Sequence, residues 1–460
     1  MSTAVPNVTP LLDAFRTRRT PSAQVADAKE IRATGFESLL TLLACLIPVA
    51  VCLYLVDIQP LFAIRDVEFT QPDVVVILLV LVVMGRALFV GFHPLRKDFF
   101  LPLFLFLVAT VISALNASDG LRAAASVVQI VEFGLIAWCF SLIRTPRNFY
   151  AIIYVTFGIF IVETVIAAFQ FAAGATMPLG TFVGHQQFAF YTSFSAAIAL
   201  ALVLSDKEKV RRAWYSIVLA VLLFGSLLGQ ERAPWLAFVF AGIAVAVYSG
   251  KNRKKYLTGF LITVVIGATL VVAIPQLRDV TISRFAEAKN DTEQSNSLLS
   301  RMAVWGVAYK FFVEHPILGV GPKNFQTLLP HYLTFDEMMG SETLDPHNVW
   351  LGALAETGIV GFVTYVFLCV AILRLGTKPL AMDLPPRIRT LCLAYVAYHI
   401  FWFTMSYHYF SKGSGHIHFM MIGLMLGSST GIRANRASLE SPSFLRLSRA
   451  GLPHRSADYR

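Results

Sequence analysis

The sequence predicts an all-α protein that crosses a membrane about twelve times and carries one large loop on the outer side. Of its 460 residues, 56% are hydrophobic and only 14% are charged, and the mean hydropathy is +0.64. Soluble chains carry about a quarter charged residues, so this chain lacks the polar surface that water requires. This excludes a large soluble enzyme, a disordered scaffold and a nucleic-acid-binding domain. The five cysteines lie in apolar stretches and indicate neither a disulfide framework nor thiol chemistry.

Twelve stretches are apolar enough to cross a bilayer, which takes about 20 residues of helix. They cover residues 36–56, 74–91, 99–114, 122–142, 149–172, 187–204, 214–229, 234–248, 256–275, 349–373, 388–406 and 416–432. Spans seven and eight are so close in the sequence that they must form a tight hairpin. The first 35 residues are polar and precede a long span, which indicates a cytoplasmic tail and no cleaved signal peptide.

The distribution of basic residues orients these spans. With both termini in the cytoplasm, and with charged residues near the span ends counted with the adjoining loops, the cytoplasmic side carries 27 Lys/Arg against 10 Asp/Glu, and the outer side carries 10 against 15. Short basic loops are typical of the cytoplasmic side, so the net charge of +10 reports topology and gives no reason to expect nucleic acid. The predicted regions are a cytoplasmic tail (1–35), nine spans (36–275), a large periplasmic loop (276–348), three spans (349–432) and a second cytoplasmic tail (433–460).

The long outer loop is too long and too polar to be a simple connection, and loops of that kind are usually functional. Inside it, apolar residues recur on one face of a helix that we expect to lie along the membrane surface. That face consists of Leu298, Met302, Trp305, Tyr309 and Phe312. Two prolines and two glycines between positions 316 and 322 then end the helix and turn the chain.

A histidine and an amide stand where this loop meets the tenth span, at His347 and Asn348. A neutral imidazole at the membrane boundary can accept a proton from a substrate hydroxyl near pH 7; the alternative is a histidine that only caps the helix. In a continuous helix His347 shares a face with Leu351, Leu354, Gly358 and Gly361. The two glycines on this face favour close helix packing. Glu356 then lies on the opposite side and roughly 13 Å along the axis, out of reach of His347.

Two arginines on the outer side are candidates for binding phosphate. Arg232 lies in the hairpin Gly229–Trp235, where a guanidinium can hold a phosphate with two parallel hydrogen bonds. The alternatives for Arg232 are lipid headgroups or a local pair with Glu231. Arg301 lies beside the apolar face of the loop helix, so it faces either solvent or a cleft.

Other polar residues give weaker predictions. His408, His416 and His418 gather near the last outer loop, but they lack a carboxylate or thiol partner for a metal, and their aromatic neighbours indicate an interfacial belt. Asp66 and Glu68 form an acidic pair for which a solvated loop is the preferred interpretation. Charged and polar residues within the spans form either a proton relay or, as we favour, internal ion pairs: Arg86, Glu132, Glu163 and His399. Phosphate-binding, dinucleotide and nucleophile-elbow motifs do not occur, which weakens ATP-driven transport and hydrolysis as functions.

In the order and placement of these parts, the chain resembles the O-antigen ligase and polymerase superfamily of bacterial envelope glycosyltransferases. The resemblance covers about 180–362. It consists of Gly184-His185-Gln186-Gln187-Phe188-Ala189 before the sixth span, the arginine hairpin Arg232-Ala233-Pro234-Trp235-Leu236, Arg301…Trp305…His315-Pro316-Ile317-Leu318-Gly319-Val320-Gly321, and His347-Asn348 followed by Glu356-Thr357-Gly358. The chain departs from the family at Glu231, where a serine is usual, and at Gln186 or Gln187, where asparagine is more frequent.

The resemblance implies a fold of the GT-C kind in the bacterial inner membrane and a donor glycan on undecaprenyl diphosphate. It implies transfer at the periplasmic face, with inversion and without a metal or other cofactor. Arg232 and Arg301 would stabilise the diphosphate leaving group, and His347 would deprotonate the acceptor hydroxyl. The expected substrate-binding residues are Asn348, Trp305 and Gln187. Asn348 is also expected to orient the imidazole of His347. The acceptor stays open: a ligase uses the lipid A core, a polymerase a lipid-linked repeat unit, and a related group protein hydroxyls.

The competing function is a twelve-span exporter or lipid-glycan flippase, since twelve spans with both ends inside are typical of transporters. Transporters are built from internal repeats with binding sites near the bilayer midplane. This sequence has no visible repeat, and its distinctive polar residues cluster at the outer boundary. The transferase is therefore the preferred interpretation.

Overall fold

The computed structural model describes residues 34–55, 62–64, 67–92, 94–182, 185–287, 297–333, 346–377, 384–405 and 413–439. Its elements are α3 (Leu46–Leu55), β1 (Phe62–Ile64), β2 (Val67–Phe69), α4 (Gln71–Val90), α5 (Lys97–Ala114), α6 (Gly120–Phe140), α7 (Pro146–Ala172), α8 (His185–Ser205), α9 (Lys209–Leu228), α10 (Arg232–Tyr248), η1 (Gly250–Asn252), α11 (Arg253–Ala273), α12 (Pro275–Glu287), α13 (Ser297–Glu314), α14 (Phe325–Leu328), η2 (Leu329–His331), α16 (Val349–Thr377), α18 (Pro386–Met405) and α19 (Ser414–Leu439). Within these residues the strands form one short antiparallel hairpin that the sequence did not predict, with Phe62 opposite Phe69. The prediction of an all-α protein is confirmed.

Helices occupy all twelve positions at which the sequence predicts a span. Among the described residues, nine helices are long and apolar enough to cross a membrane, beginning with Thr34–Tyr54. Three predicted spans fall short of that standard: α10 has only 17 residues, and α18 and α19 are long enough but less apolar. Much of α18 and α19 is buried among other helices, so these two need less apolar surface. The chain is a multi-pass helical membrane protein.

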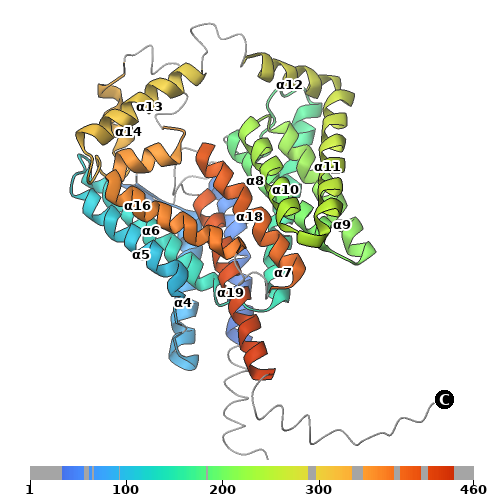
Figure 1. The fold of residues 1–460 in the computed structure, drawn as a ribbon, viewed down its shortest axis with the longest axis horizontal. Coiled ribbons are helices and arrows are strands. Elements are labelled where there is room, and N and C mark those ends of the chain that lie inside the picture. Colours follow the sequence, from blue (N-terminus) through green and yellow to red (C-terminus); the bar gives the residue numbers. More distant parts are fainter. Residues whose placement is uncertain are drawn as a thin grey trace, which may run out of the picture.

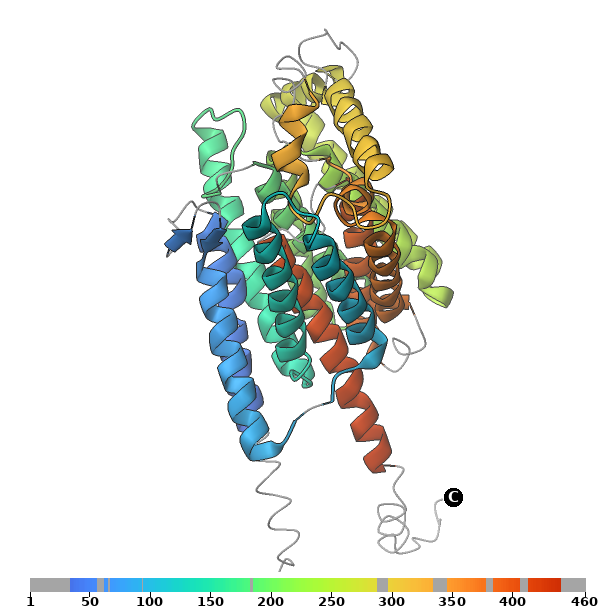
Figure 2. The ribbon, with the colours of Figure 1, turned by 90° about the vertical axis from the view of Figure 1, so that its left-hand side faces the viewer.

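Two groups of helices flank a central pair. Figure 1 shows α18 and α19 between one group that contains α4, α5, α6 and α16 and another that contains α7 to α11. The central pair joins the groups because α19 packs on α6, whereas α18 packs on α10, α8 and α16. Figure 2 shows α12 and α13, from the long loop, at one end of the bundle, while α19 ends at the other.

Two local features shape α6 and its contact with α19. Asp119 caps α6, its side chain accepting hydrogen bonds from the backbone N–H groups of Leu121 at 3.1 Å and Arg122 at 3.2 Å. Gly423 lets α19 approach α6 closely, since a Cβ at this position would lie 2.6 Å from the carbonyl oxygen of Ala137. Small residues at such contacts are how membrane helices pack without a hydrophobic driving force between them.

Helix α16 is broken at Gly358, which corrects the prediction of one continuous span over 349–373. Gly358 has φ 60° and ψ −166°, a conformation available essentially only to glycine. The halves fold back on each other: the rings of Trp350 and Tyr365 lie 5.6 Å apart, whereas a straight helix would separate these positions by roughly 22 Å. The second half, 359–377, is about 28 Å long and sufficient to cross a bilayer alone.

The segment around Gly319 supplies the hydrogen bonds that this break removes. The N–H groups of Val320 and Gly321 donate to the carbonyls of Ala355 (3.0 Å) and Glu356 (2.9 Å), at the end of the first half-helix. The N–H of Ile359, at the start of the second half, donates to the carbonyl of Pro316 at 2.9 Å. The backbone groups freed by the break are thus paired, as a buried site requires.

Helix α13 forms as predicted but packs through a different face. Val304, Val307, Ala308 and Phe311 are its buried residues and form a small core with Val320, Phe325, Leu329 and Ala355. On the predicted face, Met302 is 55% exposed and Tyr309 is 62% exposed. The smaller residues face the protein because the first half of α16 and the segment 318–329 lie close against them. The glycines and prolines of 316–322 end the helix at Glu314, as predicted.

Candidate functional site

His347 lies in a bend between the buried Pro346 and the start of α16. Its side chain is half-buried, and its backbone has φ 47°, in the left-handed region that non-glycine residues rarely adopt. Asn348 follows as the cap of α16: its Oδ1 accepts the N–H groups of Trp350 (3.0 Å) and Leu351 (3.2 Å). His347 itself stands before the helix, so the predicted helical face shared with Leu351 and Gly358 is wrong.

Trp305 connects α13 to this bend. Its indole Nε1–H donates to the carbonyl oxygen of Pro346 at 2.6 Å, although 41 positions separate the two residues. Arg301 is exposed and precedes Trp305 by four positions, which is about 6 Å along the same side of α13. The structure thus brings Arg301 and His347 to the same region of the molecule.

Tyr332 contacts the C-terminal end of α13. Tyr332 donates to Glu314 Oε2 at 3.1 Å and packs edge-on against Phe311, while Lys310 lies 4.6 Å from the centre of the Tyr332 ring. The hydrogen bond to Glu314 raises the pKa of Tyr332 above its ordinary value, since only the protonated phenol can donate it. The loop helix is therefore held at its middle, by Trp305, and at its C-terminal end, by the contacts of Tyr332.

Arg232 is exposed and is the first residue of α10, directly after the turn that joins α9 to α10. Sequence reasoning missed the residue that shapes this turn, Gln230. It is buried, has φ 55°, and donates from Nε2 to the carbonyl of Thr176 at 2.6 Å. Trp235 also braces the hairpin by donating from Nε1 to the carbonyl of Ser226 at 2.8 Å. No local pattern in the sequence signals a left-handed glutamine.

Contacts between helices bring Arg232 toward the same region. The indole of Trp350, three positions after His347, donates to Thr404 Oγ1 near the end of α18 at 3.3 Å. One turn before, Phe401 packs against Phe240 of α10 at 5.5 Å between ring centres. Arg232 lies two turns from Phe240, about 12 Å along α10. In Figure 1, α18 ends between α13 on one side and α10 on the other.

Arg232, Arg301 and His347 stay candidates for a cationic site with a base. Guanidinium groups on different helices can hold a phosphate group, and an imidazole held in a bend can accept a proton. The turn before Arg232 and the bend at His347 each contain a non-glycine residue with positive φ, Gln230 and His347 itself. Strain of this kind persists where surrounding structure holds it, and it gathers at functional sites.

Gln187 lies near the N-terminal end of α8, close to the arginine hairpin. Two positions later, Ala189 touches the hairpin so closely that a Cβ on Gly229 would lie 2.6 Å from the Ala189 Cβ. Gln187 is half-buried, and its Oε1 atom is buried without a hydrogen-bond partner among the described residues. An amide oxygen in this state can accept a hydrogen bond from a ligand hydroxyl.

Glu356 lies at the break in α16, far from the bend that holds His347. It is buried, and its backbone carbonyl accepts hydrogen bonds from Ser113 Oγ at 2.8 Å and from Gly321 N–H. Ser113 also donates to the carbonyl of Leu318 at 2.7 Å, so α5 closes the junction. These contacts give the Glu356 backbone a structural role at the junction.

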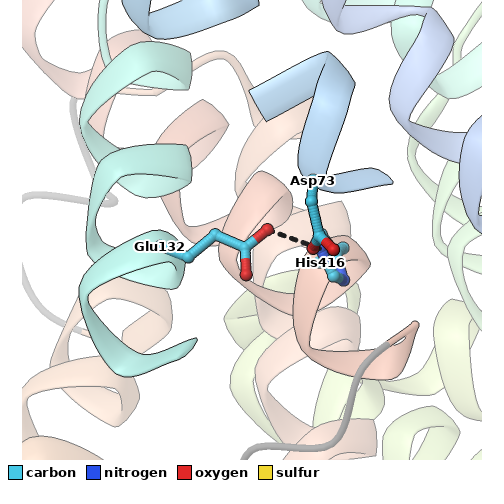
Figure 3. A group of neighbouring side chains, drawn as sticks. All are labelled: Asp73, Glu132 and His416. Carbon is cyan, nitrogen blue, oxygen red and sulfur yellow. Dashed lines mark hydrogen bonds and ion pairs between the residues drawn. The ribbon is translucent and has the colours of Figure 1, made fainter. Parts of the chain in front are cut away.

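Asp73, Glu132 and His416 come together from α4, α6 and α19 (Figure 3). His416 Nε2 lies 3.0 Å from Glu132 Oε1 and 3.9 Å from Asp73 Oδ1. The sequence offered His416 no carboxylate partner, because these residues are distant along the chain. Carboxylates and imidazole are common metal ligands, but here the Gly413 N–H donates to His416 Nδ1 at 3.2 Å. The Nε2 atom therefore carries the ring proton and donates to Glu132, an arrangement that suits hydrogen bonding better than metal binding.

The remaining polar candidates have separate partners. Glu163 accepts from Thr181 N–H and Oγ1, both at 2.8 Å, and so anchors the turn before α8. Arg86 donates to the carbonyl of Gly91, and His418 contacts the hydroxyl of Tyr395. Of the residues predicted to form internal ion pairs, Glu132 instead has a hydrogen bond with the neutral ring of His416. His408 and Asp66 lie outside the described residues, and Glu68 is an exposed residue of β2.

Comparison with known proteins gives one family match. Residues 217–366 match the family described as O-antigen ligase, a range that contains Arg232, Arg301 and His347 together. No curated protein matches the chain. One solved structure, described as "Structural coordination of polymerization and crosslinking by a peptidoglycan synthase complex", aligns at a TM-score of 0.40 and 15% identity, over 72% of this chain and 98% of that chain. At that score the likeness bears on neither fold nor function.

Proposed function

We propose that this chain, which its family match identifies as a member of the O-antigen ligase superfamily, transfers a glycan from undecaprenyl diphosphate to an acceptor hydroxyl. Membership implies a glycosyltransferase-type enzyme that acts on a lipid-linked glycan and an acceptor. The proposal adds the direction and place of the reaction: a metal-independent, inverting transfer at the periplasmic face of the inner membrane, with both termini cytoplasmic.

The observation that carries the proposal is a chain of contacts that links the three candidate residues. Trp305 of α13 donates to the bend that holds His347, Trp350 of α16 donates to the end of α18, and α18 packs on α10, whose first residue is Arg232. Cleavage of the anomeric C–O bond expels a diphosphate, on which negative charge grows in the transition state. Arg232 and Arg301 supply positive charge for that leaving group.

In this proposal His347 is the general base for the acceptor. It takes the proton from the acceptor hydroxyl as the oxygen attacks the anomeric carbon, opposite the departing diphosphate. Direct displacement inverts the anomeric centre, and the proton leaves on the imidazole. A positioned base of this kind typically contributes ~10²–10⁴-fold to the rate. Gln187 supplies an acceptor oxygen for a sugar hydroxyl near the arginine hairpin.

The test is transfer by purified protein in nanodiscs, with lipid-linked donor and core lipid A as acceptor, followed on gels. His347→Asn is the sharpest variant, because asparagine tolerates a positive φ but is no base. We expect transfer to fall at least about 100-fold while thermal stability and donor binding persist. Wild-type transfer by this variant would reject His347 as the base.

The acceptor is decided in cells. In a deletion strain, lipid-linked glycan of full length that fails to reach lipid A indicates a ligase, which is the function we propose. Accumulation of single lipid-linked repeat units indicates the alternative, a polymerase that extends such units. Full complementation by both His347→Ala and Arg232→Ala would instead favour a flippase or exporter.

A further inference from the structure

The bend that carries His347 cannot hold its conformation alone. With φ 47°, His347 is in a region that is unfavourable for a residue with a Cβ. Such a conformation persists only where neighbouring contacts determine the chain on both sides. On the C-terminal side, Asn348 caps α16 and fixes the chain to the helix.

On the N-terminal side, the fixed point is the carbonyl of Pro346, which accepts the indole N–H of Trp305 at 2.6 Å. Trp305 is itself well anchored: its neighbours Val304 and Ala308 are buried in the small core beneath α13. The indole has one polar hydrogen, and the Pro346 carbonyl accepts it. It is therefore engaged within the protein, which argues against the expected role of Trp305 as a hydrogen-bonding substrate residue.

We propose that Trp305 is a positioning residue that holds His347 in the left-handed bend and so aims its imidazole at the acceptor hydroxyl. The inference rests on the proposed function of His347 as the base. It predicts that loss of one hydrogen bond between two protein groups lowers the rate of the chemical step and leaves substrate affinity intact.

The experiment compares Trp305→Phe with Trp138→Phe in the nanodisc transfer assay. Phenylalanine keeps most of the ring volume but removes the N–H donor. Trp138 is the matched control, because its Nε1 atom is buried without a hydrogen-bond partner among the described residues. We expect Trp305→Phe to lower kcat between about 10-fold and 100-fold with both KM values within about twofold, and Trp138→Phe to change neither. A raised KM with unchanged kcat, or wild-type kinetics, would overturn the proposal.

A double-mutant comparison separates this inference from the proposed function. In the His347→Asn background, Trp305→Phe should cause no further loss, because the positioned base is already absent. A further loss equal to that in the wild-type background would show that Trp305 acts independently of His347, which rejects the inference. Full activity of His347→Asn alone would reject the proposed base, whatever Trp305→Phe does.

If Trp305→Phe does not accumulate as folded protein, replacement of Trp305 by benzothienylalanine provides the same test. In that residue sulfur replaces the indole N–H and the ring shape is unchanged. The expected fall in kcat is the same, and wild-type kcat would overturn the proposal.

Discussion

Gly358 lies so close to the backbone of Ile317 that a Cβ at position 358 would overlap the Ile317 carbonyl group. The relationship is reciprocal two positions along each segment, where a Cβ on Gly319 would overlap the backbone of Glu356. The broken helix and the segment 316–321 therefore fit together only through glycine. This junction places the first half of α16, and with it His347, beneath α13.

Replacing Gly358 with alanine should destabilise the protein by at least about 3 kcal/mol, because both the backbone conformation and the contact with Ile317 exclude a Cβ. Gly158→Ala in α7 is the control, since a Cβ there meets nothing within 4 Å and should change stability by less than about 1 kcal/mol. Thermal unfolding in detergent measures both. Equal unfolding temperatures for the two variants would contradict the junction as described.

Asn348 is expected to act first through the stability of α16. Asn348→Ala removes the cap and should cost about 1 kcal/mol, whereas Asn348→Asp retains an oxygen acceptor and should stay near wild type. Unfolding midpoints and transfer rates of the two variants check this. A stable Asn348→Ala variant with lost transfer would instead return Asn348 to a direct role at the imidazole.

The two arginines should matter for the chemical step. Arg232→Ala and Arg301→Ala each remove positive charge from the leaving group, and we expect a fall in transfer of about 10²–10³-fold. Arg278→Ala is the control, because Arg278 lies on α12 and pairs with Asp279 at 3.0 Å. Lysine at position 232 should restore only part of the rate, since an ammonium cannot form two parallel hydrogen bonds. If Arg232→Ala performs as well as Arg278→Ala, the leaving-group role is excluded.

An ion-pair cluster around Asp206, in the connection between α8 and α9, predicts how stability depends on pH. Burial alone would raise the pKa of Asp206. Two other effects outweigh burial and lower this pKa: the hydrogen bonds from Arg211 and from the Glu208 N–H, and the positive charges of Arg387 and Arg211. A lowered folded pKa means that the carboxylate stabilises the protein above its unfolded pKa of about 3.9, and that this stability is lost as the pH falls through the folded value. The stability gap between wild type and Asp206→Asn should therefore be constant from pH 7 to about pH 5 and close below about pH 4. Unfolding temperatures across this range test it, and a gap that closes between pH 7 and 5 would refute it.

The sequence predicts the helices, their order and some of the turns. Two glycine-containing segments show why one turn was predicted and another was not. Gly319 and Gly321 stand in a short run bounded by prolines, so the end of α13 was visible. The break at Gly358 was not, because Leu351, Leu354 and Gly361 have spacings that a continuous helix also satisfies. Glycine within a membrane helix is common for packing, so position 358 alone gave no warning.

Two other features depend on information that the sequence pattern does not contain. Met302 and Tyr309 marked an apolar face, but in a membrane protein the outward surface is apolar as well, so hydrophobicity does not identify the packed face. Asp73, Glu132 and His416 meet across three helices that are distant in the sequence. Only the tertiary fold reveals such a contact, and the same holds for the hydrogen bond from Trp305 to Pro346.

We predict that transfer is independent of metal, and variants in the group formed by Asp73, Glu132 and His416 test this. Because the Gly413 N–H occupies His416 Nδ1, we expect Nε2 to donate a hydrogen bond to Glu132 in the working protein. Glu132→Gln keeps a carbonyl acceptor for that donor, so it should lower stability by less than about 1.5 kcal/mol and leave transfer unchanged, whereas Glu132→Leu should destabilise more strongly. Prolonged treatment with a chelator should change neither the unfolding temperature nor the rate. Loss of transfer with a chelator and its recovery with one divalent cation, absent in Glu132→Gln, would identify a metal site here and refute both the tautomer and metal independence.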